Sequence, residues 1–554
     1  MVQIPEPVEI HSAKIRGHAA KPHRVQARLL RNLVLVLKGP YPTLRMRHRT
    51  VISLSTLAFH LLATGQAGSL DTTFSNDGTT TTPIGTYEIG YDWVIQPDGG
   101  IVGVGYSDTQ IALVRYLPNG SLDPSFSGDG IVITAICTDE NRAQAVALQP
   151  DGKIVIAGYT SSAFTPYEHP FVARYLPDGS LDPDFGNAGA VIQYDWQHAV
   201  GTAIAVQSDG KIVVAGYALF DGYLVLRYDT AGILDTTFGS GGIVVLPLFS
   251  DLHGPSGLEL LPDGRMLLAG SVDNGFNEDL CVIRLGPDGD LDPSFGVGGI
   301  TTHPIGNSDD QLNGLAVQPD GRAVVCGSMQ AGANFSFALA RYDTLGTLDP
   351  TFDTDGIVVT DIDLGQDLGL DLLVQPDGRI VAAGYSAQGA TYGFALARYE
   401  VDGSLDSTFG TNGIVITTFG GPVASVYGVA QQTDGAIVAG GVAQGSDYDF
   451  AVARYLDALA LGVLDDVNEG NSYLIYPNPI DDIANLTYTL TRPDHLSLRL
   501  LDLDGKTIMT YLDIVERAKG EHREQLNLSR VAPGPYLLQM LAEQRLFAVR
   551  IIKR

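Results

Sequence analysis

The sequence is poor in cysteine, tryptophan and positive charge. It has three Cys and two Trp in 554 residues, and 34 Lys and Arg stand against 63 Asp and Glu. Three cysteines cannot build a disulfide framework. The formal net charge of −29 argues against binding of nucleic acid or an anionic membrane, because phosphates would be repelled. Hydrophobic residues at 45% and charged residues at 18% indicate a folded chain and exclude a disordered one.

The common catalytic signatures are also missing. The chain has no HExxH zinc motif, no GxSxG nucleophile motif and no phosphate-binding loop. Its central histidines, His169, His198, His253 and His303, are too far apart for metal-ligand spacing. We therefore predict no catalytic residue, no metal and no other cofactor. The best local candidate for calcium is Asp353-Thr354-Asp355-Gly356, which offers few of the oxygen ligands that a calcium loop needs.

The positive charge that the chain does have is concentrated at its start. Residues 1–67 contain ten Lys and Arg and two Asp and Glu, which leaves a net charge of −37 for the other 487 residues. The basic run at 46–49 precedes a mostly apolar stretch at 51–63 and small residues at Gly65 and Ala67. This order is typical of a secretory signal.

We therefore predict a signal peptide over 46–67 with cleavage after Ala67, and a non-native or disordered extension over 1–45. The apolar run is too short for an ordinary membrane span, so no transmembrane segment is predicted in the mature protein. A buried apolar helix is the alternative.

A unit of 52–59 residues repeats seven times between residues 68 and 456. Each copy carries Leu-Asp-x-x-Phe, then an Asp-Gly turn, then an Arg. The Leu-Asp-x-x-Phe aspartates are Asp71, Asp123, Asp182, Asp235, Asp292, Asp349 and Asp406, and the arginines are Arg115, Arg174, Arg227, Arg284, Arg341, Arg398 and Arg454. A catalytic residue is needed only once, so we interpret this set as architectural. The Asp would hold its own loop and the Arg would clamp a strand to that loop.

Each unit reads as four short strands, A to D, with no helix. In the second copy these are 130–134, 145–148, 153–159 and 171–176, with a tight turn at 149–152. Strand C is apolar on both faces, so both faces must be covered. The pattern predicts an all-β fold in which 68–456 form a seven-bladed β-propeller with four-stranded blades. An open β-solenoid is the rival fold, although its coils are usually shorter than about 30 residues.

The phase of the repeats indicates how the ring closes. In six copies the Arg stands eight residues before the next Asp, but Asp71 has no Arg before it and Arg454 has no such Asp after it. We predict that an N-terminal strand near 79–83 completes the last blade, and that Arg454 pairs with Asp71 across the closure.

The Leu-Asp-x-x-Phe, Gln-Pro-Asp-Gly, Ala-Gly-Tyr and Ala-Arg-Tyr series resembles the delta-60 repeats of bacterial secreted and surface proteins. That resemblance implies a propeller-like domain and no defined reaction. After a linker at 457–472, residues 473–554 carry alternating runs that predict a small β-sandwich. One possible role for this sandwich is that of an ordinary ligand-binding module.

The motifs of this last segment resemble the type A C-terminal sorting domain of the type IX secretion system of Bacteroidota. The residues that carry the resemblance are Tyr476, Pro477, Asn478, Pro479, Gly505, Gly534, Tyr536 and Lys553. The resemblance implies the type IX machinery as a partner, and release from the cell or attachment to its outer surface.

Function is expected where the copies differ. The A–B and C–D loops lie on one face of a propeller, here called the variable face, and they carry unrepeated aromatic and acidic residues. The candidate binding residues are Tyr91, Trp93, Tyr167, Glu168, His169, Tyr194, Asp195, Trp196 and His198. Such side chains suit a glycan or a protein ligand. Ordinary solvated loops are the alternative.

The sequence thus predicts a secreted or surface-displayed monomer that binds or scaffolds without catalysis. The alternative is a secreted polysaccharide-degrading enzyme. It would use unrepeated carboxylates such as Glu140, Glu168 or Asp195, since glycosidases act through paired carboxylates.

Overall fold

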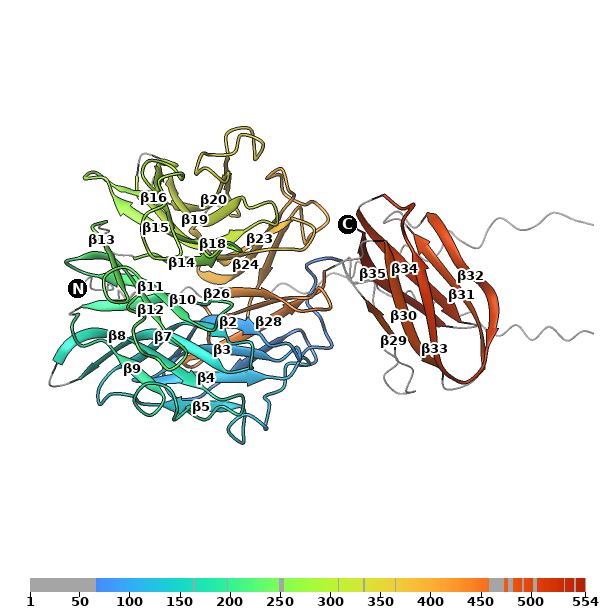
Figure 1. Cartoon of the computed structure of the whole chain (residues 1–554), viewed down its shortest axis with the longest axis horizontal. Coiled ribbons are helices and arrows are strands. Elements are labelled where there is room, and N and C mark those ends of the chain that lie inside the picture. Colours follow the sequence, from blue (N-terminus) through green and yellow to red (C-terminus); the bar gives the residue numbers. More distant parts are fainter. Residues whose placement is uncertain are drawn as a thin grey trace, which may run out of the picture. The chain divides into compact units, whose positions relative to one another are not determined.

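The computed structural model of the chain (Figure 1) describes residues 66–457 except 163–164, 197, 249–253, 307, 332–333 and 364. It also describes 473–476, 482–490, 493–501, 506–532, 534–542 and 545–553. Every regular element in these ranges is a β-strand. Within the same ranges there is no helix that could span a membrane. The predicted extension over 1–45, most of the signal peptide and most of the linker lie outside the described residues.

The repeat region folds into seven antiparallel four-stranded sheets. The first three blades are β2 (Glu88–Ile95), β3 (Ile101–Ser107), β4 (Gln110–Tyr116), β5 (Ile131–Thr134); β6 (Asn141–Leu148), β7 (Ile154–Ser162), β8 (Thr165–Tyr175), β9 (Ala190–Ile192); and β10 (Ala199–Val206), β11 (Ile212–Ala218), β12 (Gly222–Tyr228), β13 (Ile243–Leu246). In each of these blades, the strand named first is the innermost strand.

The remaining four blades keep the same order, except that the last takes its outer strand from the N-terminus. They are β14 (Gly257–Leu260), β15 (Met266–Asp273), β16 (Glu278–Leu285), β17 (Ile300–His303); β18 (Asp310–Val317), β19 (Ala323–Ala331), β20 (Asn334–Tyr342), β21 (Ile357–Thr360); β22 (Asp367–Val374), β23 (Ile380–Gln388), β24 (Thr391–Tyr399), β25 (Ile414–Thr417); and β26 (Ala424–Gln431), β27 (Ile437–Gln444), β28 (Tyr448–Tyr455), β1 (Thr79–Thr82).

The blades close into a ring. Each inner strand contacts the next, from β2 through β6, β10, β14, β18 and β22 to β26, and β26 contacts β2 again. Strand β1 pairs with β28, with Thr79 opposite Ala453 and Thr82 opposite Phe450. Figure 1 accordingly shows β26 and β28 beside β2. The seven-bladed propeller with an N-terminal closing strand is confirmed, and an open solenoid is excluded.

The third strand of each repeat, strand C, is covered on both faces by neighbouring blades. On β7, Val155 packs with residues of blade 3, whereas the next residue, Ile156, packs with residues of blade 1. Successive side chains of a strand point to opposite faces, so an uninterrupted apolar run suits a strand between two sheets.

The turn that leads into strand C is fixed by its glycine. In blade 2, Gln149 N donates to Lys153 O at 2.8 Å and Gly152 N donates to Gln149 O at 2.9 Å. Gly152 has a φ of +85°, which a residue with a side chain adopts at a cost. Asp151 closes the turn by accepting from Lys153 N at 3.2 Å. This geometry explains why Asp-Gly recurs in every blade.

The C-terminal segment forms a β-sandwich of two sheets. One sheet has the order β29 (Tyr473–Tyr476), β30 (Ile483–Leu490), β33 (Gly520–Asn527), and the other has β32 (Thr507–Arg517), β31 (Asp494–Leu501), β34 (Gly534–Ala542), β35 (Arg545–Lys553). Alternate residues of β30, such as Leu486 and Tyr488, share one core with Leu496 and Leu498 of β31. The predicted sandwich is therefore confirmed.

Candidate functional site

The structure brings each repeated arginine together with its aspartate. The pairs are Arg174–Asp182 (2.8 Å), Arg227–Asp235 (2.9 Å), Arg284–Asp292 (2.8 Å), Arg341–Asp349 (2.9 Å), Arg398–Asp406 (2.8 Å), Arg115–Asp123 and, across the closure, Arg454–Asp71. The other carboxylate oxygen caps the loop, as where Ser294 N donates to Asp292 at 2.9 Å. Hydrogen bonds from Ser294, together with Arg265 and Arg284, hold the pKa of Asp292 well below its usual range.

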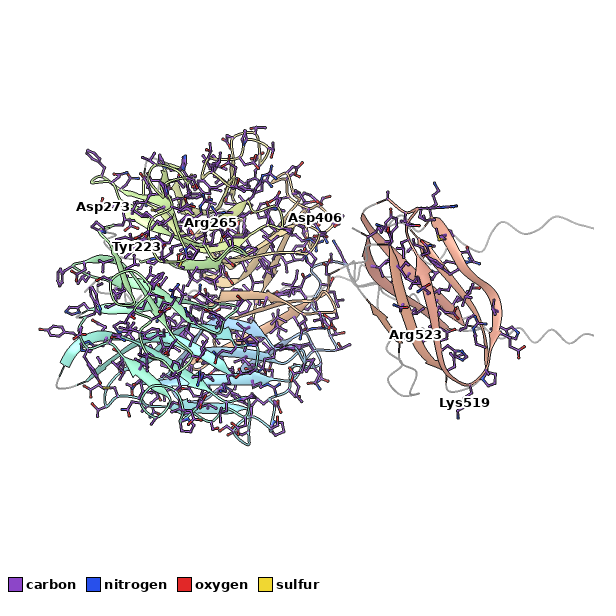
Figure 2. The ribbon with its side chains drawn as sticks, in the orientation of Figure 1. Tyr223, Arg265, Asp273, Asp406, Lys519 and Arg523 are labelled. Carbon is purple, nitrogen blue, oxygen red and sulfur yellow. The ribbon has the colours of Figure 1, made fainter. Side chains whose placement is uncertain are left out.

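A second cation completes this network in five blades. Lys153, Lys211, Arg265, Arg322 and Arg379 directly follow the Asp-Gly turn. Arg265, labelled in Figure 2, lies 2.6 Å from Asp263 and 3.0 Å from Asp292. The sequence analysis missed this cation, although Lys or Arg at that position was the available signal.

The two blades that meet at the closure lack the second cation. Gly100 and Ala436 replace it in blades 1 and 7. There the strand-D arginines, Arg115 and Arg454, each pair with both carboxylates themselves. In these two blades one arginine therefore pairs with the two carboxylates that two cations share in the other five.

The repeated residues also join neighbouring blades. Arg284 lies 4.7 Å from the ring centre of Phe295, the Phe of the same motif, and donates to Thr344 O of the next blade at 2.5 Å. A backbone bond from Gly296 N to Leu345 O, at 2.7 Å, lies beside it. At the closure the corresponding acceptor is Ala67 O, which binds Gly410 N at 2.7 Å. The repeated set therefore builds the interfaces of the ring.

Trp93 does not lie on a loop, and its prediction as a binding-face residue is wrong. It lies in β2 with 3% of its surface exposed and packs on Phe450 of blade 7. A Cβ at Gly428 or Gly440 would collide with its indole, so these glycines leave the space that it fills. A β-bulge between Gly90 and Asp92 sends Trp93 into the core.

Seven other candidate residues gather between blades 2 and 3. His198 Nδ1 lies 2.6 Å from Glu168 Oε2, and the Tyr167 ring lies 4.7 Å from the His198 ring. Tyr194 is exposed and packs on His169, while Trp196 packs on the core between the two blades. Asp195 is exposed beside them.

Two corrections concern this group. His169 is 3% exposed and its Nδ1 bonds Trp196 O at 2.6 Å, so it does not form part of an open surface. The sequence analysis missed Leu219 and Phe220, which are exposed in the same region, with Phe220 lying 6.3 Å from the His198 ring. A single exposed Phe in a loop gave no signal in the sequence.

A tyrosine cluster surrounds Arg142 where the inner strands begin. We define the cluster as Tyr87, Tyr91, Tyr106, Tyr159, Tyr427 and Tyr448. The Arg142 Cζ lies 4.2 Å from the Tyr106 ring centre and 6.0 Å from that of Tyr159. Tyr91 packs on Tyr106 at 5.9 Å and on Tyr427 at 5.4 Å. Of this cluster, the sequence analysis chose only Tyr91 as a candidate binding residue.

Burial keeps these phenols protonated. It raises the pKa of Tyr91, Tyr106, Tyr159 and Tyr427 above the ordinary value for tyrosine. The hydroxyls therefore remain hydrogen-bond donors at neutral and moderately alkaline pH.

Three half-buried carboxyls lie on the inner strands of blades 1, 4 and 6. Burial raises the pKa of Asp92 to about 6, that of Glu259 to about 7 and that of Asp371 to about 8. Asp92 accepts from Val146 N at 2.8 Å, and Asp371 accepts from Val429 N at 2.7 Å. Each of these aspartates thus ties its blade to the next one.

The unrepeated acids of the enzyme alternative either have side-chain partners or are exposed. Glu140 pairs with Arg142 and Glu168 pairs with His198, while Asp195 is exposed. Among the residues that the structure describes, no three His, Cys, Asp or Glu side chains converge as metal ligands. In the candidate calcium turn, Asp355 accepts from Ile357 N at 3.0 Å. The absence of a cofactor stays a prediction.

The predicted sorting motif falls partly on described residues. Tyr476 ends β29, Gly534 begins β34 and Lys553 ends β35. The Tyr536 hydroxyl donates to Ala532 O at 2.9 Å, and Lys553 Nζ lies 3.5 Å from Asp482. Pro477, Asn478, Pro479 and Gly505 lie outside the described residues.

Known protein families match both folded regions. A β-propeller domain of unknown function, DUF5122, matches residues 96–126, 149–185, 207–238, 261–295, 318–352 and 375–409, and a secretion system C-terminal sorting domain matches 474–554. The chain carries a DUF5122 β-propeller and a type IX sorting domain. The sorting domain places this DUF5122 protein in Bacteroidota and marks it for secretion and attachment to the outer cell surface.

Several solved structures resemble the DUF5122 protein at low identity. The polysaccharide lyase Uly1 is 10% identical with a TM-score of 0.38, covering 68% of this chain and 91% of its own. The α-L-arabinanase of Penicillium chrysogenum is 12% identical with a TM-score of 0.37, covering 68% and 99%. A gluconolactonase of Xanthomonas campestris is 14% identical with a TM-score of 0.32, covering 70% and 95%. No curated protein matches significantly. Likenesses this distant support no argument about activity.

Proposed function

We propose that this protein is a non-enzymatic binding module of the cell surface that captures a glycan on the variable face of its propeller. The tyrosine cluster around Arg142 is the observation that carries the proposal. The repeated ion pairs serve the ring itself, so the cluster is the largest group of polar aromatic side chains left for a ligand among those described here.

Tyrosines suit a sugar ligand for two reasons. A phenol ring offers an apolar face to the C–H groups of a pyranose, and its hydroxyl bonds a sugar hydroxyl. Tyr87 is 43% exposed and packs on Tyr448 at 5.0 Å, so part of the cluster is open to solvent. The raised pKa of Tyr91 and Tyr159 keeps their hydroxyls as donors.

A polysaccharide-degrading enzyme is the second candidate, and one observation favours it. Glu140 and Glu168 both lie close enough to Tyr159 for their charges to raise its pKa, after the larger effect of burial. Two unrepeated acids therefore flank one phenol of the cluster. Against this candidate, both acids already have side-chain partners: Glu140 pairs with Arg142, and Glu168 contacts His198 Nδ1.

Screening the secreted protein on a glycan array tests the proposal. We expect at least one glycan to bind, and Tyr91→Ala with Tyr427→Ala to weaken that binding about tenfold or more. Ile233→Ala is the control, because Ile233 is 65% exposed and lies in the repeated turn after β12, outside the cluster and outside the candidate binding residues. Release of new reducing ends or unsaturated sugars from a bound glycan would instead establish the enzyme. An array without any hit would contradict the binding role.

A further inference from the structure

Arg142 is the only cation of the propeller that the repeat does not explain. Residues 68–456 contain thirteen Lys and Arg. Twelve are the strand-D arginines and the cations after Asp-Gly: Arg115, Lys153, Arg174, Lys211, Arg227, Arg265, Arg284, Arg322, Arg341, Arg379, Arg398 and Arg454. The thirteenth is Arg142, which stands at the start of an inner strand.

Other blades show that the fold needs no charge at this position. Arg142 lies opposite Tyr159 in the pairing of β6 with β7. The residues at the corresponding position of five other blades are Ile89, Val200, Gln311, Leu368 and Ser425. All five are uncharged, so the fold does not require the arginine that blade 2 has at this position.

The surroundings of Arg142 leave donors unused. Its guanidinium rests between Tyr106 and Tyr159 and pairs with Glu140 through one terminal nitrogen. Its Nε is buried without a hydrogen-bond partner, and 27% of the side chain remains exposed. A guanidinium has five N–H donors, and a single carboxylate does not satisfy them. The faces of the Tyr106 and Tyr159 rings hold the group in place without using its N–H bonds, and the Tyr91 hydroxyl takes up one further donor.

We infer that Arg142 is a receptor for an oxyanion on the captured glycan, a carboxylate or a sulfate carried by one sugar of an otherwise neutral chain. This inference rests on the proposed function, because it names the ligand class of the same cluster. The tyrosines bind the sugar faces, and the exposed edge of the guanidinium binds the anionic substituent.

The charge of the protein limits the ligand to few anionic groups. Residues 68–554 carry a net charge of −37, and the variable face has one unrepeated cation. A densely charged polyanion would be repelled over most of this surface. A chain with isolated acidic sugars gains the contact with Arg142 and meets little of that repulsion.

Saturation-transfer NMR on the full-length secreted protein tests the inference. The probes are D-glucuronate, D-galacturonate and D-galactose 6-sulfate, with D-glucose and D-galactose as neutral counterparts. We expect the acidic sugars to bind about tenfold more tightly than the neutral ones. The preference should disappear in Arg142→Gln and survive in part in Arg142→Lys. Arg322→Gln removes the same charge at an architectural site and should keep the preference.

The outcomes separate the inference from the proposed function. Equal binding of acidic and neutral sugars, or a preference unchanged in Arg142→Gln, overturns the inference while the binding role stands. If no sugar binds here or on the glycan array, both are overturned. An acetylated tetra-glutamate peptide is the last probe. Its binding through Arg142, without binding of acidic sugars, would show a peptide receptor and overturn the inference. A carboxylate-only or sulfate-only response identifies which oxyanion is recognised.

Discussion

Arg398 is the largest fully buried side chain among the residues that the structure describes, with 1% of its surface exposed. It lies 2.8 Å from Asp406 Oδ2 and 3.0 Å from Asp457 Oδ1, and its guanidinium packs 4.5 Å from the Phe409 ring centre. Burying a charge is costly unless it is paired and hydrogen-bonded. Removing one partner of such a pair is therefore expected to weaken the blade interface strongly, because a buried charge is left less well compensated.

Replacing Arg398 with Met should destabilise the propeller by about 3–5 kcal/mol, because it removes one of the two cations that pair with the buried carboxylates of Asp406 and Asp457 and leaves only Arg379. Urea unfolding monitored by circular dichroism measures the change. Arg322→Gln is the control, since Arg322 is 38% exposed and exposed pairs contribute about 1 kcal/mol or less. Similar losses for both variants would contradict the role given to burial.

Asp371 should make the protein less stable as the pH rises. Its carboxyl has a folded pKa of about 8, mainly because of burial, against an ordinary value of 3.8. The folded chain therefore binds a proton that the unfolded chain releases above pH 4. The resulting stabilisation is complete below pH 4 and is lost between about pH 4 and 8, at about 1.4 kcal/mol per pH unit.

Asp371→Asn removes this titration, so its free energy of unfolding should fall less steeply over the same window. Asp92 and Glu259 still titrate in the variant, with pKa values of about 6 and 7. The slope should therefore decrease without vanishing. Identical pH profiles for the two proteins would show that Asp371 is not protonated in the folded state.

At the scale of strands, the repeat pattern predicted most of the architecture. The eight-residue interval between Arg and Asp identified the pairs, and the unmatched Asp71 and Arg454 identified the closing strand. The bulges of the inner strands could not be predicted, because one extra residue leaves the composition of the strand unchanged. For this reason the sequence analysis placed Trp93 with Tyr91, although the bulge sends Trp93 into the core.

A side chain at Gly440 should loosen the seam between blades 7 and 1. The Cβ of Gly440→Ala would overlap the indole of Trp93, and overpacking costs about 1–3 kcal/mol. Gly445→Ala is the matched control, because the nearest atom to its Cβ lies 4.0 Å away. Adding Trp93→Leu to Gly440→Ala should recover part of the lost stability. Leu is the residue at this position in blades 4 to 6. Thermal unfolding measures all three effects.

At the scale of the whole molecule, the ring depends on one strand from the far end of the chain. Deleting residues 66–83 removes β1, Asp71 and the carbonyl of Ala67, and leaves β28 as an unprotected edge. We expect the truncated protein to aggregate and to lose cooperative unfolding. A synthetic peptide of residues 66–83 should restore a monomeric, cooperative protein. A truncated chain that stays monomeric and stable alone would contradict this dependence.

The same seam bears on signal cleavage. Ala67 is fully buried beside Phe409, and its carbonyl accepts from Gly410 N. Cleavage after Ala67, as the sequence predicts, would remove this contact from one of the seven blade interfaces. N-terminal sequencing of the secreted protein tests this cleavage site, since a mature end before Gln66 would keep the contact and contradict it. A mature protein that begins at Gly68 would show that the ring tolerates the loss.

The pairing of β1 with β28 also determines when the fold can be completed. Ribosomes make residues 79–82 more than 360 residues before their partners at 450–453. The first strand to leave the inner membrane must therefore wait, unpaired, until nearly the whole repeat array has followed it. Six sheets can assemble in sequence during export, but the seventh cannot, so the protein completes its fold only in the compartment that receives the entire chain.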